Sequence, residues 1–299
     1  MERSIRLLHS DDYPLLETMD TGIEDDYVKR VFHRLSTGDN RLYGLFLGDQ
    51  LVSLGGINIY AKRYAMLGRL RSDRRFRGQD FATKVMTYML KEAFLIDGIQ
   101  WVGANTQEEN VPARRVMEKI GFSPYTMLHG ALTDDTTTLT IDAKPWKLID
   151  DLQRKKDWLQ QTYVDSSEVF PYECYYLFPA SEDLFQDEKL REWSFYENEE
   201  KNRFLITKID QKKYHYLHVI YPWNDMTEQV GLWETITADY KKLLQQNGEE
   251  TYIWMDLSKE EASSLPSNHQ FTLPSPWILY GMNKEKWDQL KMCQALVKN

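Results

Sequence analysis

Cysteine is scarce in this chain of 299 residues, which has only Cys174 and Cys293. Two cysteines so far apart provide neither a disulfide framework nor a metal-type pairing, so we expect no structural disulfide and no zinc site. The six histidines are scattered as well. His215 and His218 fall in one strand-like run, where alternation places them on opposite faces. We therefore predict that the protein uses no metal.

Long apolar runs and excess positive charge are also missing. No stretch of about 18 apolar residues occurs, which argues against a membrane-spanning helix. The start, Met-Glu-Arg-Ser-Ile-Arg, lacks the apolar core of a secretory signal, and with so few cysteines this favours a cytoplasmic protein. The formal net charge of −9 argues against general nucleic-acid binding. We expect no membrane or nucleic-acid partner, and either a monomer or a homodimer.

The composition changes along the chain in a way that indicates two domains. Eight of the nine tryptophans follow residue 143, whereas most of the arginines precede it. The dipeptide Lys144-Pro145 lies at this change, and proline interrupts a strand. A chain of this length suits two ordinary domains or one large one, and the change in composition favours two. We therefore predict one domain at 1–143 and a second at 144–299.

A well-delimited helix is predicted at 110–120. Asn110 suits the N-cap, Pro112 suits the first turn, and Gly121 suits the position that ends a helix. Phe122 then begins a new apolar segment. One apolar face of the helix would be formed by Ala113, Val116, Met117 and Ile120.

A basic turn upstream of this helix has the composition of an anion site. The segment Arg74-Arg75-Phe76-Arg77-Gly78-Gln79-Asp80-Phe81-Ala82 follows a strand-like run at 66–71 and begins another predicted helix. The first backbone N–H groups of a helix are unpaired, and the helix dipole favours negative charge there. Three arginines in the turn add planar donors that suit phosphate.

Together, the two segments resemble the GNAT family, the Gcn5-related N-acetyltransferases that use acetyl-CoA. The pyrophosphate loop of that family has the pattern Arg/Gln-x-x-Gly-x-Gly/Ala, whose defined positions are occupied here by Arg77, Asp80 and Ala82. The family's Asn-x-x-Ala helix, which ends in Gly-Phe, corresponds to Asn110 and Ala113. Both motifs occur in the family's order and at family-like spacing.

The resemblance covers residues 1–143 and implies an α/β (α+β) fold, with a mixed sheet flanked by helices. In this fold a last hairpin would pair Tyr125–Gly130 with Thr137–Ile141. Residues 144–299 have no recognisable cofactor motif. Their predicted order of strand, long helix and strand resembles the second half of a GNAT core. A degenerate GNAT-like half is therefore one interpretation of this second α/β domain.

The resemblance also implies acetyl-CoA as co-substrate, held between the splayed strands at 66–71 and 100–105. A neutral amine would attack the thioester directly, a backbone N–H group would hold the oxyanion, and the thiolate would leave. The strand would contact the pantetheine arm and the turn would hold the pyrophosphate. The predicted cofactor-binding residues are Leu70, Arg71, Ser72, Arg75, Arg77, Gly78, Gln79, Asp80, Phe81, Ala82 and Asn110.

Two residues depart from the family pattern. Asp80 stands where the family usually has glycine; aspartate tolerates a left-handed backbone, but its carboxylate would repel the pyrophosphate. Met117 stands where many members have a tyrosine that protonates the departing thiolate. A thiol pKa of about 8.5 makes thiolate a fair leaving group, so loss of this acid need not abolish turnover. The sequence assigns no catalytic residue.

The leading hypothesis is an acetyl-CoA-dependent N-acyltransferase acting on a small-molecule amine. Arg69 and Asn105 are the predicted substrate-binding residues. Arg69 and Arg71 share one strand face, which would favour an acceptor that bears a carboxylate unless they pair with acids. The alternative is a catalytically impaired acyl-CoA sensor or scaffold, which Asp80 and Met117 would explain. A protein-lysine acetyltransferase is a third interpretation.

Overall fold

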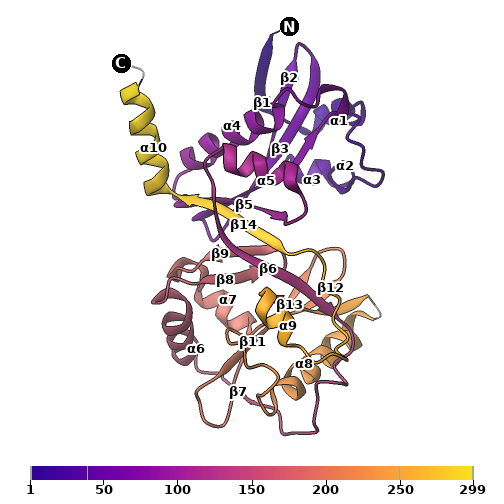
Figure 1. The fold of residues 1–299 in the computed structure, drawn as a ribbon, viewed down its shortest axis with the longest axis vertical. Coiled ribbons are helices and arrows are strands. Elements are labelled where there is room, and N and C mark those ends of the chain that lie inside the picture. The colour runs from indigo at the N-terminus through magenta and orange to yellow at the C-terminus, as the bar shows by residue number, and fades with distance from the viewer. Residues whose placement is uncertain (1, 39, 249, 298–299) are drawn as a thin grey trace. The chain divides into compact units, whose positions relative to one another are not determined.

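The structure is a computed structural model that describes residues 2–38, 40–248 and 250–297. The chain forms two compact units (Figure 1). The first comprises Met1–Tyr125 and Leu279–Asn299, and the second comprises Thr126–Ile278. This division concerns packing, and the sequence-domain boundary after residue 143 stays a prediction.

The first unit is a mixed sheet flanked by helices, as predicted. Its strands lie in the order β1-β2-β3-β4-β5-β14; the pairs from β1 to β4 are antiparallel, and β5 is parallel to β4. Its elements are β1 (Arg3–Leu7), η1 (Ser10–Asp12), α1 (Tyr13–Glu17), α2 (Tyr27–Arg30), α3 (Phe32–Leu35), β2 (Arg41–Leu47), β3 (Gln50–Tyr60), β4 (Tyr64–Ser72), η2 (Arg74–Phe76), α4 (Phe81–Leu95), β5 (Trp101–Gln107), α5 (Val111–Lys119) and, from the far end of the chain, β14 (Trp277–Asn283) and α10 (Lys284–Val297).

Apolar spacing explains how the helices attach to this sheet. Helix α4 lies against β3 and β4, and its buried residues recur at helical spacing, as in Val85, Met86 and Met89. The short helices α1 to α3 contribute to another core cluster, in which Leu16 and Phe32 are fully buried. Burial of each such side chain away from water contributes about 1.5–3 kcal/mol to the free energy of folding. The sheet between these helices is therefore a rigid support for the loops at its edge.

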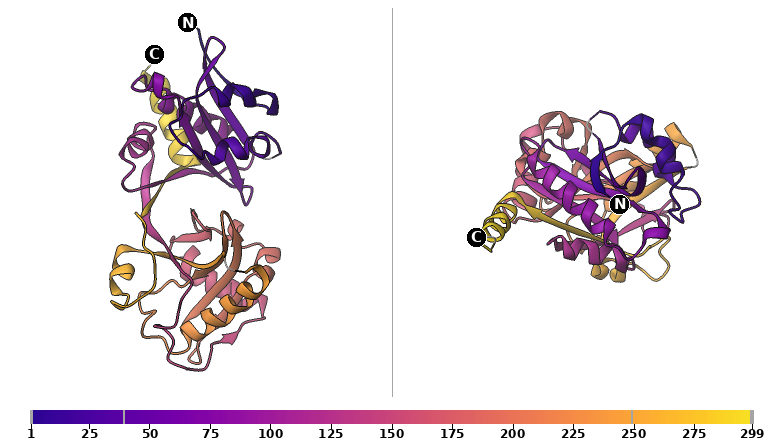
Figure 2. Two further views of the ribbon diagram at one scale, coloured as in Figure 1. Left: turned by 90° about the vertical axis from the view of Figure 1, so that its right-hand side faces the viewer. Right: turned by 90° about the horizontal axis from the view of Figure 1, so that it is seen from above.

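The second unit repeats much of this order. Its strands lie in the order β6-β13-β12-β11-β10-β7, and α8 packs against β11, β12 and β13 (Figure 2, left panel). Its elements are β6 (Ser123–Thr133), β7 (Lys147–Leu148), α6 (Leu152–Leu159), the π-helical η3 (Gln160–Val164), β8 (Val169–Glu173), β9 (Tyr176–Pro179), η4 (Glu182–Leu184), α7 (Asp187–Glu192), β10 (Ser194–Glu197), β11 (Phe204–Gln211), β12 (His215–Ile220), α8 (Leu232–Asn247), β13 (Thr251–Leu257) and α9 (Lys259–Ser264).

The two units share one order of elements: three antiparallel strands, a long helix, and then a strand parallel to the third. Strands β2, β3 and β4 are antiparallel neighbours, and α4 leads from β4 to the parallel strand β5. Strands β10, β11 and β12 are likewise antiparallel, and α8 leads from β12 to the parallel strand β13. The second unit is thus an α/β unit with GNAT-like topology.

The predicted hairpin at 125–141 is wrong. Strand β6 runs on to Thr133 and pairs with β13, whereas residues 137–139 form a turn and 140–141 have no regular structure. Thr133 and Asp135 start that turn through side-chain hydrogen bonds to the backbone, a local competition with strand formation. The neighbour of β5 is instead β14, a strand from the C-terminal end of the chain (Figure 1).

Candidate functional site

Strands β4 and β5 pair only at their beginnings. The parallel register runs from Tyr64 opposite Trp101 to Met66 opposite Gly103 and stops there, although β4 continues to Ser72. Beyond this point the two strands diverge, so the edge of β4 at 67–72 has no β5 partner in the described register. A strand edge of this kind presents backbone N–H and C=O groups to a ligand.

A β-bulge reshapes β4 within this diverging region. The pairing with β3 skips from Gly68 to Arg71, and Arg69 has the positive φ of 56° that is rare for a residue with a side chain. The Arg69 guanidinium donates a hydrogen bond to the Asn58 side chain. Asn105 is half-buried on β5, beyond the last paired residue. The structure thus places both predicted substrate-binding residues where the strands diverge.

Arg71 has a structural partner that the sequence did not reveal. Its Nε and Nη2 atoms donate to the two carboxylate oxygens of Asp26 at 2.7 and 2.8 Å. The Asp26 side chain is fully buried and that of Arg71 is 12% exposed. Burial opposes ionisation of Asp26, but the hydrogen bonds from Arg71 and the Val28 amide outweigh it, so the Asp26 pKa lies below its usual value. The Arg71 guanidinium is therefore occupied.

The remaining β4 residues of the predicted cofactor site are Leu70 and Ser72, which lie at the end of the strand. The Leu70 carbonyl accepts a hydrogen bond from Arg71 Nη1 at 3.0 Å. The Ser72 hydroxyl lies 3.0 Å from the Ser53 hydroxyl on β3. Both residues are half-buried at the end of the strand, where they connect it to the basic turn.

Two arginines of the turn are used to hold it in place. The buried Asp73 carboxylate accepts from the Arg75 backbone at 3.0 Å and from Arg75 Nε at 2.9 Å. The Arg75 side chain is the main cause that lowers the Asp73 pKa, so this carboxylate is a poor general base. Arg74 and Arg75 also donate to the carbonyls of Gly22 and Thr18.

The third arginine remains available. Within the described residues, the exposed side chain of Arg77 makes no hydrogen bond or ion pair. Gly78 and Asp80 both have positive φ, 80° and 62°, and the exposed residue Gln79 lies between them. The aspartate thus adopts the left-handed backbone for which the family's glycine is suited.

The Asp80 carboxylate is neutralised from α5. Its Oδ1 atom accepts from Lys119 Nζ and from the Thr83 hydroxyl, both at 2.8 Å. Lys119 is the main cause that lowers the Asp80 pKa, followed by Thr83, so the group is a paired carboxylate at neutral pH. The ion pair lies in solvent, with side chains 59% and 47% exposed for lysine and aspartate.

Helix α4 begins without a capping side chain. Asp80 is at its N-cap position but makes no side-chain hydrogen bond to the first turn. The amides of Phe81 and Ala82 thus keep the unpaired character of a helix N-terminus beside Arg77. Asn110 behaves differently, because its side-chain oxygen caps α5 by accepting from the Ala113 amide at 3.2 Å. Met117 is buried on the same helix.

This geometry agrees with the comparison to known families. Residues 11–123 match the acetyltransferase (GNAT) domain model. This part of the chain is a GNAT acetyltransferase domain. The activity that this domain suggests is acyl transfer to an amine. A comparison with curated protein sequences gave no match.

Solved structures of GNAT proteins resemble the chain in fold. A GCN5-related N-acetyltransferase from Sphaerobacter thermophilus is 14% identical and has a TM-score of 0.54, covering 94% of this chain and 95% of its own. The ribosomal-protein-S18-alanine N-acetyltransferase from Escherichia coli is also 14% identical, with a TM-score of 0.38, covering 42% of this chain and 81% of its own. The first comparison extends the GNAT-type fold over both units.

The second unit repeats the fold but closes the position that corresponds to the cofactor loop. Helix α8 also starts after a left-handed residue, Gly231, with φ of 83° and no side-chain cap. A Cβ atom on Gly231 would lie only 2.2 Å from the Lys144 carbonyl oxygen, so the chain at 144 covers this helix start. Glu234 and Thr235 in the first turn accept hydrogen bonds from the backbone at 141–146. The unit therefore offers no open helix N-terminus here.

Other kinds of site receive no support from the described residues. Within that part of the chain, no group of three or more histidine, cysteine, aspartate or glutamate residues could hold a metal ion. None of its helices is both long and apolar enough to cross a membrane. Cys174 is buried, Cys293 is exposed, and neither forms a disulfide.

Proposed function

We propose that the GNAT domain binds acetyl-CoA and transfers its acetyl group to the amine of a small molecule. The observation that carries this proposal is the combination of diverging strands with an uncapped helix start. The edge of β4 at 67–72 lacks a β5 partner, and α4 begins nearby in sequence after a turn with two left-handed residues. An extended pantetheine arm needs such an edge, and a pyrophosphate needs such a helix start.

The predicted cofactor residues divide into two kinds on this proposal. Arg77 supplies charge to the pyrophosphate, because its guanidinium has no other partner among the described residues. The residues Gly78 to Ala82 supply backbone amides. Arg71 and Arg75 act through the backbone, since their guanidinium groups are held by Asp26 and Asp73. The uncharged side chain of Asn110 caps α5, so we expect this residue to position the helix rather than to add much cofactor affinity itself.

The transfer step needs little from side chains. The neutral amine nitrogen attacks the thioester carbon, a backbone N–H on the free edge of β4 stabilises the oxyanion, and the carbon–sulfur bond breaks to release CoA thiolate. The amine proton passes to water or buffer, and the thiolate is protonated from solvent. Met117 cannot serve as the acid, so we expect the rate of this step to depend on thiolate stability.

The structure supports a carboxylate-bearing acceptor less strongly than the sequence did, because only one of the two β4 arginines is left to bind a carboxylate. Arg71 is occupied by Asp26, which leaves Arg69 as the cation in the diverging region. Its hydrogen bond to Asn58 is neutral, so its charge is not compensated by that contact. We propose Arg69 and Asn105 as the residues that contact the acceptor.

An acyl-CoA sensor remains the second candidate, because Met117 replaces the usual acid on α5. Asp80 no longer favours it, since Lys119 neutralises the carboxylate. The deciding experiment follows thiol release from acetyl-CoA with an amino acid, a polyamine and a lysine-containing peptide. If the protein transfers acetyl groups, at least one acceptor should cause amine-dependent release of thiol. The rate of this release should fall in Arg69→Met if that acceptor bears a carboxylate. Tight acetyl-CoA binding without release for any amine would overturn transfer and favour the sensor.

A further inference from the structure

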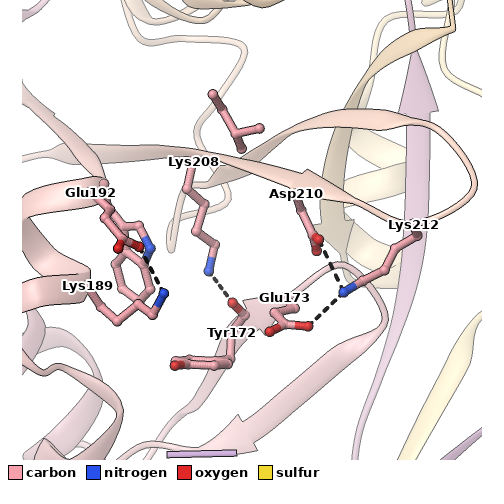
Figure 3. Close-up of a pocket in the computed structure, with 9 residues that line it drawn as sticks. Tyr172, Glu173, Lys189, Glu192, Lys208, Asp210 and Lys212 are labelled. Atoms are coloured by element: carbon pink, nitrogen blue, oxygen red, sulfur yellow. Dashed lines mark hydrogen bonds and ion pairs between the residues drawn. The ribbon is translucent and has the colours of Figure 1, made fainter. Parts of the chain in front are cut away.

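A cavity of about 350 Å³ lies within the second unit and is unrelated to the cofactor loop (Figure 3). Its lining comes from β8, α7 and β11. The rings of Tyr172 and Trp193 are part of the lining, and Nζ of Lys208 from β11 lies 5.6 and 4.3 Å from their centres. A volume of this size accommodates one small organic molecule.

Lys208 is the unusual member of this lining, because it is a buried ammonium. Only 7% of the residue is exposed. Its Nζ donates to the carbonyl oxygens of Pro171 at 2.9 Å and Tyr172 at 2.5 Å, and it lies 4.3 Å from the centre of the Trp193 ring. An ammonium carries three protons, so two carbonyl acceptors leave one donor for another group.

The other lysines of the cavity already have counter-ions. Lys189 pairs with Glu192 at 2.9 Å, and Lys212 pairs with Glu173 at 2.7 Å. Figure 3 shows these pairs on either side of Lys208. Within the described residues, no carboxylate lies within ion-pair distance of Lys208. The cavity therefore has paired charges at its sides and an ammonium without a counter-ion between them.

A buried charge without a counter-ion is costly, because burial penalises the charged form of the group. Burial lowers the pKa of Lys208 to about 7, and neighbouring acids oppose this only partly. The titratable and charged groups around it come from β8, α7, β11, β12, β13 and the β8–β9 turn; they are Tyr172, Glu173, Cys174, Lys189, Glu192, Asp210, Lys212, His218 and Asp256.

We propose that this cavity binds a small monocarboxylate with an apolar body, using the Lys208 ammonium as the counter-ion and the Trp193 and Tyr172 rings as walls. The free N–H of Lys208 meets the carboxylate, and a charge-assisted hydrogen bond of this kind is strong in a buried site. A second negative charge on the ligand is disfavoured, because Glu173, Glu192 and Asp210 surround the ammonium. The site is independent of acetyl transfer.

Proton linkage gives a test on the unaltered protein. The probe is sodium 3-phenylpropionate, and 3-phenylpropylamine, which has the opposite charge, is the control. Calorimetric titrations in buffers of different ionisation enthalpy report the protons taken up on binding. Because the carboxylate favours charged Lys208, whose pKa is about 7, we expect uptake of most of one proton at pH 8, much less uptake at pH 6, and roughly tenfold weaker binding at pH 8. The amine control should not bind.

Two variants locate the effect. Lys208→Met should abolish binding of the probe, and Lys241→Met, at an exposed lysine of α8 outside the cavity lining, should retain binding and proton uptake. Circular dichroism checks that each variant folds. If Lys208→Met does not fold, proton uptake by the wild-type protein decides alone. Absence of probe binding at both pH values, binding without proton uptake at pH 8, or binding retained by Lys208→Met would each overturn the proposal and leave Lys208 as a structural cation that secures β8.

Discussion

The Asp80–Lys119 ion pair offers a quantitative test of the cofactor loop. If the pyrophosphate lies at the start of α4, the Asp80 carboxylate is close to it, and Lys119 offsets the repulsion. Removing Lys119 with Lys119→Met exposes the cofactor to an uncompensated negative charge. Removing the carboxylate with Asp80→Asn leaves a positive charge, and asparagine keeps the left-handed backbone at φ 62°. The double variant restores neutrality.

The expected size of the effect follows from exposure. Because the two side chains are 59% and 47% exposed, the dielectric around them is near that of water. Two unit charges about 8 Å apart then interact by about 0.5–1 kcal/mol, a change of about two- to fivefold in dissociation constant. We expect Lys119→Met to weaken acetyl-CoA binding by this factor, Asp80→Asn to strengthen it by no more, and the double variant to match wild type.

The assay is calorimetric titration with acetyl-CoA at low salt and at 0.15 M salt, where a screening length of about 8 Å should shrink each effect. Asp80→Ala provides the backbone control: the charge change is that of Asp80→Asn, but alanine at positive φ should lower the free energy of unfolding by about 1 kcal/mol. Strengthening of more than tenfold by Asp80→Asn would refute neutralisation by Lys119. Equal stability of the alanine and asparagine variants would refute the backbone argument.

Three further outcomes test the packing. Arg71→Met should lower the free energy of unfolding by about 3 kcal/mol in a urea titration, because it leaves the buried Asp26 carboxylate unpaired; a loss under 1 kcal/mol would contradict the buried pair. Folding lowers the pKa of Asp26, so the stabilisation that its carboxylate provides is present above the unfolded pKa of about 4 and is lost as the pH falls through the folded pKa. The free energies of unfolding of the wild type and of Asp26→Asn should therefore converge at acid pH. Parallel curves of unfolding free energy against pH would contradict this role of Asp26. Gly231→Ala should destabilise by more than 2 kcal/mol through the clash with the Lys144 carbonyl, whereas Gly48→Ala, with similar φ and open space, should cost about 1 kcal/mol; equal thermal shifts would exclude the clash.

Residues that begin and end helices made much of the GNAT domain predictable from the sequence. The N-cap Asn110, the early proline and the terminal glycine delimit α5, and the structure has this helix at Val111–Lys119. The basic turn before α4 was predictable for the same reason, because the backbone preferences of glycine and aspartate act over a few residues. The signals that succeeded therefore concern neighbours in sequence.

Long-range partners were beyond such signals. Asp26 lies 45 residues from Arg71, and Lys119 lies 39 residues from Asp80, so neither pair follows from spacing within an element. The strand beside β5 comes from β14, whereas β6 pairs with β13. Alternating apolar residues predict that a segment is a strand but not which strand it joins. Likewise, the buried Lys208 lies in an ordinary strand pattern, and its burial arises from packing against β8.

The claim that matters most is that acetyl-CoA binds at the turn before α4 through Arg77. Its most direct test is calorimetric titration of the wild-type protein, Arg77→Ala and Arg34→Ala with acetyl-CoA at fixed salt. Arg34 is an exposed arginine on α3, so its removal changes the net charge equally. We predict saturable binding by wild type and Arg34→Ala, weakened about tenfold or more by Arg77→Ala. Equal binding by all three proteins, or none by the wild type, would contradict the assignment.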